Sequence, residues 1–337
     1  MINQRLRFIS IHSLFPPRTG GIKGWTKGTG NIVLFSLFAI LIILYSPLYA
    51  EQIELGIIGN SEIIVQFEKP LKNAAKEVEN IYPGIKTGLE KTIGWRVTFR
   101  PTVVLIKDSK TFRKMAGNNQ FVAFAVPRKN LIVIDYSKMK THPFTLEITL
   151  RHELCHLLLH HYIRKENLPR WLDEGISQWV SGGIAEIIMD TKRSPLKDAT
   201  LSGRFIPISA LAEGFPKDKK SLLLAYEESK SIVEYMGREY GSKGVLEVLN
   251  NLKNGDGVDA AIQKALKIPV QELEIRWHKQ LEKRITWVTY LSGNLYEILF
   301  FLAALITVVG FIRLLLKKRN YKDDDDDDYY DYNEKEE

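Results

Sequence analysis

Two histidines and a glutamate stand close together in the segment His-Glu-Leu-Cys-His, at His152, Glu153 and His156. Residues four apart lie on one face of an α-helix, one turn from each other, so both imidazoles can bind the same metal ion. A glutamate beside the first histidine can take a proton from a metal-bound water molecule. The spacing predicts a catalytic zinc site, and a third protein ligand is needed to distinguish that site from a chance pattern.

Geometry excludes a third histidine as the remaining ligand. His160 continues the four-residue series, but it lies about 12 Å along the helix axis from His152 and cannot share one ion with both other histidines. The extended three-histidine motif requires glycine and histidine at the two positions where this chain has Leu159 and Tyr162. The three-histidine class of zinc sites is therefore excluded.

The remaining candidates lie in the segment Pro-Arg-Trp-Leu-Asp-Glu-Gly at positions 169–175. A second helix there can return a carboxylate to the metal, and two histidines plus one glutamate with an open fourth position form a common catalytic arrangement. We predict Glu174 as the third ligand. Its neighbour Asp173 would point about 100° away on the same helix.

Other residues near the motif have simpler interpretations. His160 and His161 are interpreted as exposed residues at a helix end, where a histidine suits the helix dipole. Cys155 is the single cysteine of the chain, so no intramolecular disulfide can form. Its thiol would face away from both histidines of the motif, and we interpret it as buried packing.

The elements that must position this site change type along the chain. Before residue 135 there are β-rich runs and one helical pattern from Leu71 to Tyr82, which Pro83 is expected to end or break. Phe121–Asp135 reads as a hairpin. The predicted strands are Ile63–Phe67, Val103–Ile106 and Leu131–Ile134. The predicted helices are Phe144–His161, Pro169–Ser181, Ser221–Tyr240, Gly244–Asn251, Val258–Leu266 and Val270–Arg284. A sheet followed by a helical half predicts the α+β class.

The His-Glu-Leu-Cys-His segment, the seventeen residues that separate His156 from Glu174, and the Pro-Arg-Trp-Leu-Asp-Glu-Gly phrase together resemble the gluzincin zinc metallopeptidases, in particular the bacterial peptidase MA-like family. Ala225–Ser229 resembles a motif on the helix that follows in that family. The resemblance covers roughly residues 60 to 285. It implies a zincin-like domain with an N-terminal mixed β-sheet, an edge strand, an active-site helix and a C-terminal helical half.

The resemblance also implies an activity, the hydrolysis of peptide bonds in a peptide or protein substrate. One Zn²⁺ ion would polarise the scissile carbonyl while Glu153 activates water as the general base. Tyr226 is the implied oxyanion donor, with plain packing as the alternative. Gln178, one turn beyond the third ligand, could orient His152, although relatives often carry a carboxylate there. The strand within Phe121–Val126 would bind an extended peptide by strand addition.

Two other functions remain open at this point. The chain could be a catalytically silent peptidase-like module that binds or scaffolds on the cell surface, or a structural membrane protein with an accidental motif. The net charge of +7 comes without a Lys/Arg run interleaved with aromatic residues, so a nucleic-acid partner is not expected. The oligomeric state is left open.

Two apolar segments bracket the predicted domain. Ile32–Tyr45 is uncharged and follows a basic leader, which is the pattern of a secretory signal, so residues 1–50 are predicted as a signal peptide or an uncleaved signal anchor. The second run, Ile298–Leu316, is interrupted only by Arg313. We predict a single transmembrane helix at 295–316, since nineteen helical residues cover about 28 Å of a hydrocarbon core about 30 Å thick.

Basic residues on the flank of this second run predict its orientation. Lys317–Arg319 should remain cytoplasmic by the positive-inside bias. Residues 51–290 then form an extracytoplasmic peptidase domain at a bacterial cell membrane, single-pass, or two-pass if the leader is uncleaved. Residues 317–337, basic and then acidic, are expected to be a disordered cytoplasmic tail.

Overall fold

The computed structural model of the chain falls into two compact units, one made of Met1–Ala199 with Arg204–Trp277 and the other of Thr200–Gly203 with His278–Glu337. The structure describes residues 7–9, 53–117, 120–139, 143–182, 194–284 and 293–327. The apolar run Ile32–Tyr45 of the predicted signal segment and the end of the acidic tail lie outside these residues, whereas Arg7–Ile9 of the predicted leader is described as a strand.

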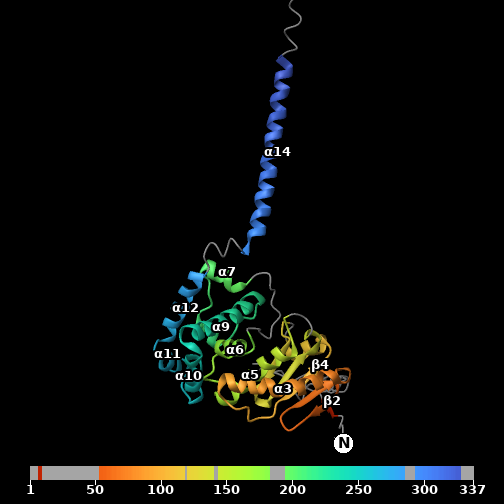
Figure 1. Cartoon of the computed structure of the whole chain (residues 1–337), viewed down its shortest axis with the longest axis vertical. Helices are drawn as coiled ribbons and strands as arrows, with labels where there is room; N and C mark the ends of the chain where they lie inside the picture. The colour runs from red at the N-terminus through yellow and green to blue at the C-terminus, as the bar shows by residue number, and fades with distance from the viewer. Residues whose placement is uncertain are drawn as a thin grey trace, which may run out of the picture. The chain divides into compact units, whose positions relative to one another are not determined.

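A six-stranded mixed sheet forms the N-terminal half of the first unit (Figure 1). Three neighbouring strands run parallel to one another: β3 (Ile64–Glu68), β4 (Thr102–Ile106) and β6 (Leu131–Asp135). The other neighbouring strands pair antiparallel. β4 and β6 are apolar almost throughout and buried, as expected of central parallel strands covered on both faces. In sheet order the strands are β1 (Arg7–Ile9), β2 (Ile53–Gly59), β3 (Ile64–Glu68), β4 (Thr102–Ile106), β6 (Leu131–Asp135) and β5 (Ala123–Val126).

The predicted hairpin is confirmed as β5 and β6, with Ala123 opposite Ile134 and Val126 opposite Leu131. A 3-10 turn (η2, Pro127–Lys129) joins the strands, and Asn130 closes it in the left-handed region at φ 47°, which asparagine tolerates better than most residues. β5 ends the order of the described strands, so this hairpin supplies the sheet with an edge.

Helix α3 (Lys72–Ile93) corrects one prediction, because it continues through Pro83 for ten more residues. Proline inside a helix costs about 3 kcal/mol. The same helix buries Val78, Tyr82, Ile85 and Leu89 on one face, and each large apolar side chain removed from water contributes about 1.5–3 kcal/mol. Burial of this face therefore outweighs the local preference to stop.

The chain after residue 143 is mainly helical, which confirms the coarse α+β layout. Gly241 lies in the left-handed region at φ 71° and ends helix α9 (Lys219–Glu239), as glycine often does. The chain enters the next helix, α10 (Gly241–Lys253), at once. The remaining helices are α4 (Ser109–Ala116), α5 (Leu146–Tyr162), α6 (Arg170–Val180), α7 (Pro195–Ser202), α8 (Ile208–Glu213), α9 (Lys219–Glu239), α10 (Gly241–Lys253), α11 (Val258–Leu266) and α12 (Val270–Arg284), with short 3-10 turns η1 (Lys69–Leu71) and η3 (Tyr136–Lys138).

Helix α5 is the central helix of the first unit. The Thr145 hydroxyl caps its N-terminus by accepting a hydrogen bond from the backbone N–H of Ile148 at 3.2 Å. The helix packs against α3, α6, β5 and β6, and the stretch 152–159 is buried along its whole length. Side chains on α5 are therefore held by packing from several directions.

The second unit contains α14 (Leu295–Asp327), drawn in Figure 1 as one unbroken helix. Its stretch Leu295–Lys317 is long and apolar enough to cross a membrane. The helix continues into the aspartate run, where the sequence predicts disorder, because extending an existing helix costs far less than starting one.

Candidate metal centre

Two helices bring the predicted ligands together. His152 and His156 project from α5, and Glu174 projects from α6; all three side chains are buried. Their facing atoms form a triangle: His152 Nε2 to His156 Nε2 is 3.1 Å, His152 Nε2 to Glu174 Oε2 is 3.8 Å, and His156 Nε2 to Glu174 Oε2 is 3.6 Å. One point, the metal point, lies about 2.0 Å from all three atoms, within the range of zinc–nitrogen and zinc–oxygen bonds.

The chemistry of these atoms also fits a cation. Glu174 Oε2 is buried and has no hydrogen-bond partner among the described residues. His156 Nδ1 lies 2.7 Å from Asp173 Oδ1, and because a carboxylate only accepts, this nitrogen carries the proton and leaves Nε2 with its lone pair. A buried carboxylate oxygen facing imidazole nitrogens at these distances can hold one metal ion.

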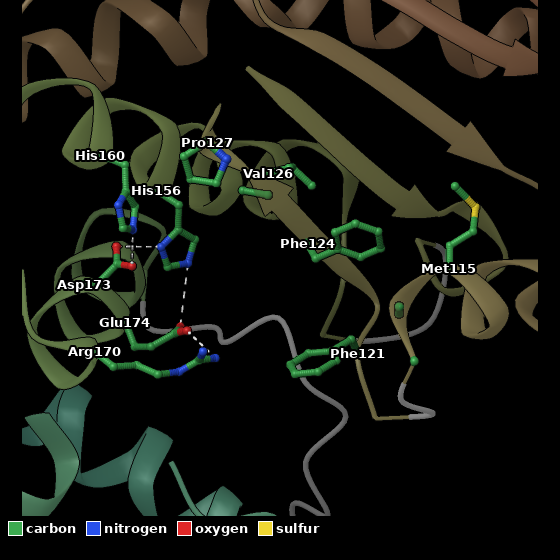
Figure 2. A pocket seen from close by; sticks show the side chains of 13 residues that line it. Met115, Phe121, Phe124, Val126, Pro127, His156, His160, Arg170, Asp173 and Glu174 are labelled. Carbon is green, nitrogen blue, oxygen red and sulfur yellow. Dashed lines mark hydrogen bonds and ion pairs between the residues drawn. The ribbon is translucent and has the colours of Figure 1, made fainter. Parts of the chain in front are cut away.

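The other oxygen of Glu174 is fixed by two donors. Arg170 Nη2 donates to Glu174 Oε1 at 3.2 Å, and the Tyr226 hydroxyl donates to the same oxygen at 3.4 Å. Burial alone would raise the pKa of Glu174, but the nearby His156, His152 and Arg170 lower it. The carboxyl group is therefore ionised at neutral pH, with Oε1 held by its two donors and Oε2 facing His152 and His156. Figure 2 shows Glu174 between His156 and Arg170.

Asp173 contacts the Nδ1 side of the His156 ring and does not reach the metal point. This agrees with the prediction that its side chain points away from that of Glu174. The second oxygen of Asp173, Oδ2, lies 2.9 Å from His160 Nε2, so one carboxylate contacts two histidines of α5 (Figure 2). Burial would raise the pKa of Asp173, but attraction and hydrogen bonds from His156 and His160 lower it below its usual range. The prediction that His160 is exposed is therefore wrong: its side chain is 20% exposed, and it belongs to the surroundings of the site. His161, by contrast, lies near Thr98 Oγ1 at 3.0 Å and is exposed as predicted.

Comparison with known families identifies the fold around these residues. A family model for the Peptidase MA superfamily matches residues 113–283, which is half of the chain and contains every ligand candidate. The chain belongs to the Peptidase MA superfamily. Among solved structures, yeast LTA4 hydrolase in complex with bestatin is similar, with a TM-score of 0.39 and 12% identity over 71% of this chain and 39% of the hydrolase chain. The chain thus spans about two fifths of that hydrolase, and no curated protein matches it.

The predicted partner of His152 in this Peptidase MA chain needs correction. Gln178 is buried, but its Nε2 donates to the backbone oxygen of Tyr226 at 3.0 Å rather than to His152. Ser181 Oγ lies 3.4 Å from His152 Nδ1 instead. Ser181 follows the last turn of α6, so helical spacing from Glu174 did not point to it. Gln178 links α6 to α9, the helix that carries Tyr226.

Two further predicted residues lie at or beside the ligands. Glu153 is fully buried on α5, next to His152. Tyr226 is also fully buried, its ring lies 5.2 Å from that of Phe215, and its hydroxyl reaches Glu174 as described above. Cys155 is a free, buried thiol, and burial raises its pKa. Both observations agree with its interpretation as a residue that packs in the core.

A cavity of about 750 Å³ opens beside the ligands. One side is polar and carries His156, Glu174, Asp173, His160 and Arg170 (Figure 2). The opposite side comes from α4, from β5 and from their flanking residues, and it is mostly apolar. Its lining residues are Met115, Ala116, Gly117, Phe121, Phe124, Ala125, Val126 and Pro127. The edge strand of the sheet therefore borders the same space as the candidate ligands.

Gly175, next to the third ligand, allows α6 to lie close against α9. A β-carbon at this position would lie 2.4 Å from the Ser229 backbone oxygen and 2.6 Å from Val233 Cγ2. Gly175→Ala should therefore destabilise the fold by about 1–3 kcal/mol through overpacking, measured by thermal unfolding of the full-length chain. Gly237→Ala is the matched control, since a β-carbon on that helical glycine meets nothing closer than 4.0 Å. Equal stability of the two variants would contradict the close packing.

Proposed function

We propose that this chain is a membrane-anchored, zinc-dependent peptidase that hydrolyses peptide bonds outside the cytoplasm. The observation that carries the proposal is the convergence of His152 Nε2, His156 Nε2 and Glu174 Oε2 on one point. Membership of the Peptidase MA superfamily supports the reaction class. Two histidines and a glutamate leave one coordination position open, as a catalytic rather than a structural zinc site requires.

Each residue has a proposed role in the reaction. A bound zinc ion would supply Lewis acidity toward the scissile carbonyl and the attacking water. Glu153 is the general base: its carboxylate takes the proton of the water and passes it to the leaving amine. A buried carboxylate next to His152 is suited to that task because little bulk water competes for the proton. Tyr226 is the proposed donor to the developing oxyanion: its single hydroxyl proton, donated to Glu174 Oε1 at 3.4 Å in this structure, would turn to the oxyanion once substrate is bound.

The substrate is proposed to be an extended peptide segment. β5 is the edge of the described sheet and contributes Phe124 and Val126 to the cavity wall. A peptide paired with that edge would satisfy its backbone hydrogen-bonding groups and place alternate side chains toward the cavity. The apolar wall, with Phe121 and Met115, suits a large apolar side chain near the scissile bond.

The location is proposed from α14 and its flank. Leu295–Lys317 can span a bilayer, and the basic residues that follow favour a cytoplasmic C-terminal side. The peptidase domain would then act on the opposite side of the membrane, with the acidic tail in the cytoplasm. A reporter fused after Glu337 and found outside the cytoplasm would contradict this orientation.

Purified full-length chain in detergent provides the test of the activity. Loaded with one equivalent of Zn²⁺, it should cleave members of a random peptide library, and a chelator should stop cleavage until zinc is restored, because the proposed reaction needs the ion. Cleavage products are identified by mass spectrometry. Stoichiometric zinc without any cleavage would favour the binding or scaffolding function, and no bound zinc would exclude both metal-based functions.

A further inference from the structure

A continuous network of hydrogen bonds joins one candidate ligand, His156, to Asp173 and His160. Asp173 Oδ1 lies 2.7 Å from His156 Nδ1, and Asp173 Oδ2 lies 2.9 Å from His160 Nε2. The three side chains are shielded, with 7% of His156, 14% of Asp173 and 20% of His160 exposed. These hydrogen bonds connect His156, a candidate metal ligand, with His160, and all three residues line the cavity (Figure 2).

The two hydrogen bonds of Asp173 together fix the orientation of its carboxylate and of the His156 ring. An ionised carboxylate only accepts hydrogen bonds, so Asp173 holds the proton of His156 on Nδ1 and leaves Nε2 for the metal point. A single contact would still allow the carboxyl group to rotate about its terminal torsion, which has a broad energy minimum. The second contact, from His160, removes that freedom. Both histidines lie on α5, one turn apart, and each forms a hydrogen bond with one oxygen of Asp173 on α6.

We propose that His160 is a positioning residue of the metal centre, which fixes Asp173 so that Asp173 in turn orients the His156 ring. The inference rests on the zinc site of the proposed function. It assigns a role to a histidine whose spacing excludes it from being a ligand. It also explains why His160 is shielded while the adjacent His161, at the same helix end, is exposed.

The neighbouring histidine provides a matched control. His161 contacts Thr98 Oγ1 and packs at 5.0 Å against the ring of Phe99, away from Asp173. His160→Gln and His161→Gln therefore change the same residue type at the same helix end. Only the first change removes a contact to the carboxylate behind His156.

The experiment measures Zn²⁺ affinity of the full-length chain in detergent by competition with a chromophoric chelator. His160→Gln should weaken zinc binding by about 3- to 10-fold and Asp173→Asn by about 10- to 100-fold, the range found for partners of metal-ligating histidines, while His161→Gln should leave it unchanged. The double variant His160→Gln/Asp173→Asn should bind zinc as Asp173→Asn does, because His160 acts only through Asp173. Melting temperatures of the zinc-free variants identify any that fail to fold.

Each outcome has one meaning. Unchanged zinc affinity in a folded His160→Gln variant, or losses that multiply in the double variant, would overturn the role of His160 while leaving the zinc site intact. Loss of affinity in His161→Gln equal to that in His160→Gln would also overturn it, since a general effect of the helix end would then explain both. If His160→Gln does not fold, the comparison of Asp173→Asn with the wild type decides, and equal affinities overturn the proposal. Absence of zinc binding in the wild type would instead refute the proposed function itself.

Discussion

Glu153→Gln should reduce kcat/KM for peptide cleavage by about 10²- to 10⁴-fold, the contribution of a general base, and should leave one zinc ion bound per chain. The amide has almost the same volume as the carboxylate, so it fits the fully buried position of Glu153 without a cavity or overpacking. It cannot accept a proton at neutral pH. The ligand atoms belong to other residues, so the metal point is preserved.

The matched control for this variant is Glu147→Gln on the same helix. Glu147 is exposed, pairs with Arg151 at 2.7 Å, and lies more than one turn before the first histidine. Its replacement should leave cleavage and zinc content unchanged. Full cleavage by Glu153→Gln would show that another group is the base, and loss of zinc from that variant would show that Glu153 is needed to build the site.

Glu174→Gln should lower the Zn²⁺ affinity by more than about 100-fold, since changes to the partners of ligands alone cost about 10- to 100-fold. The substitution replaces the buried charge of Oε2 with a neutral amide and also weakens the contacts of Arg170 and Tyr226 to Oε1. Cleavage at limiting zinc should fall in parallel. Chelator competition measures the affinity, and Glu166→Gln, an exposed glutamate shortly before α6, is the control. Wild-type affinity in Glu174→Gln would exclude this residue as a ligand.

Short-range patterns predicted much of the fold and the main cluster of the site. Helical spacing placed His152 and His156 on one face, and the bounds of α11 and α12 agree with the predicted ranges because their apolar periodicity is regular. The three residues of the candidate centre are brought together as predicted. In each case the signal lies within a few turns of one helix, where geometry depends little on the rest of the fold.

Features that depend on packing between distant segments were not predictable in the same way. Pro83 remains inside α3 because a long buried face outweighs one unfavourable residue. His160 and Ser181 became part of the site's surroundings only when α5 and α6 were packed together, and no spacing rule connects them to their partners. The short helices α4, α7 and α8 have too few turns to show a clear period.

A structure of the full-length chain with zinc bound would test the central claim most directly. The account predicts one ion at about 2.0–2.2 Å from His152 Nε2, His156 Nε2 and Glu174 Oε2, with a fourth position open toward the cavity. Asp173 should remain on His156 Nδ1 without touching the ion. An ion held without Glu174, or one bound through Asp173 and His160, would contradict the account.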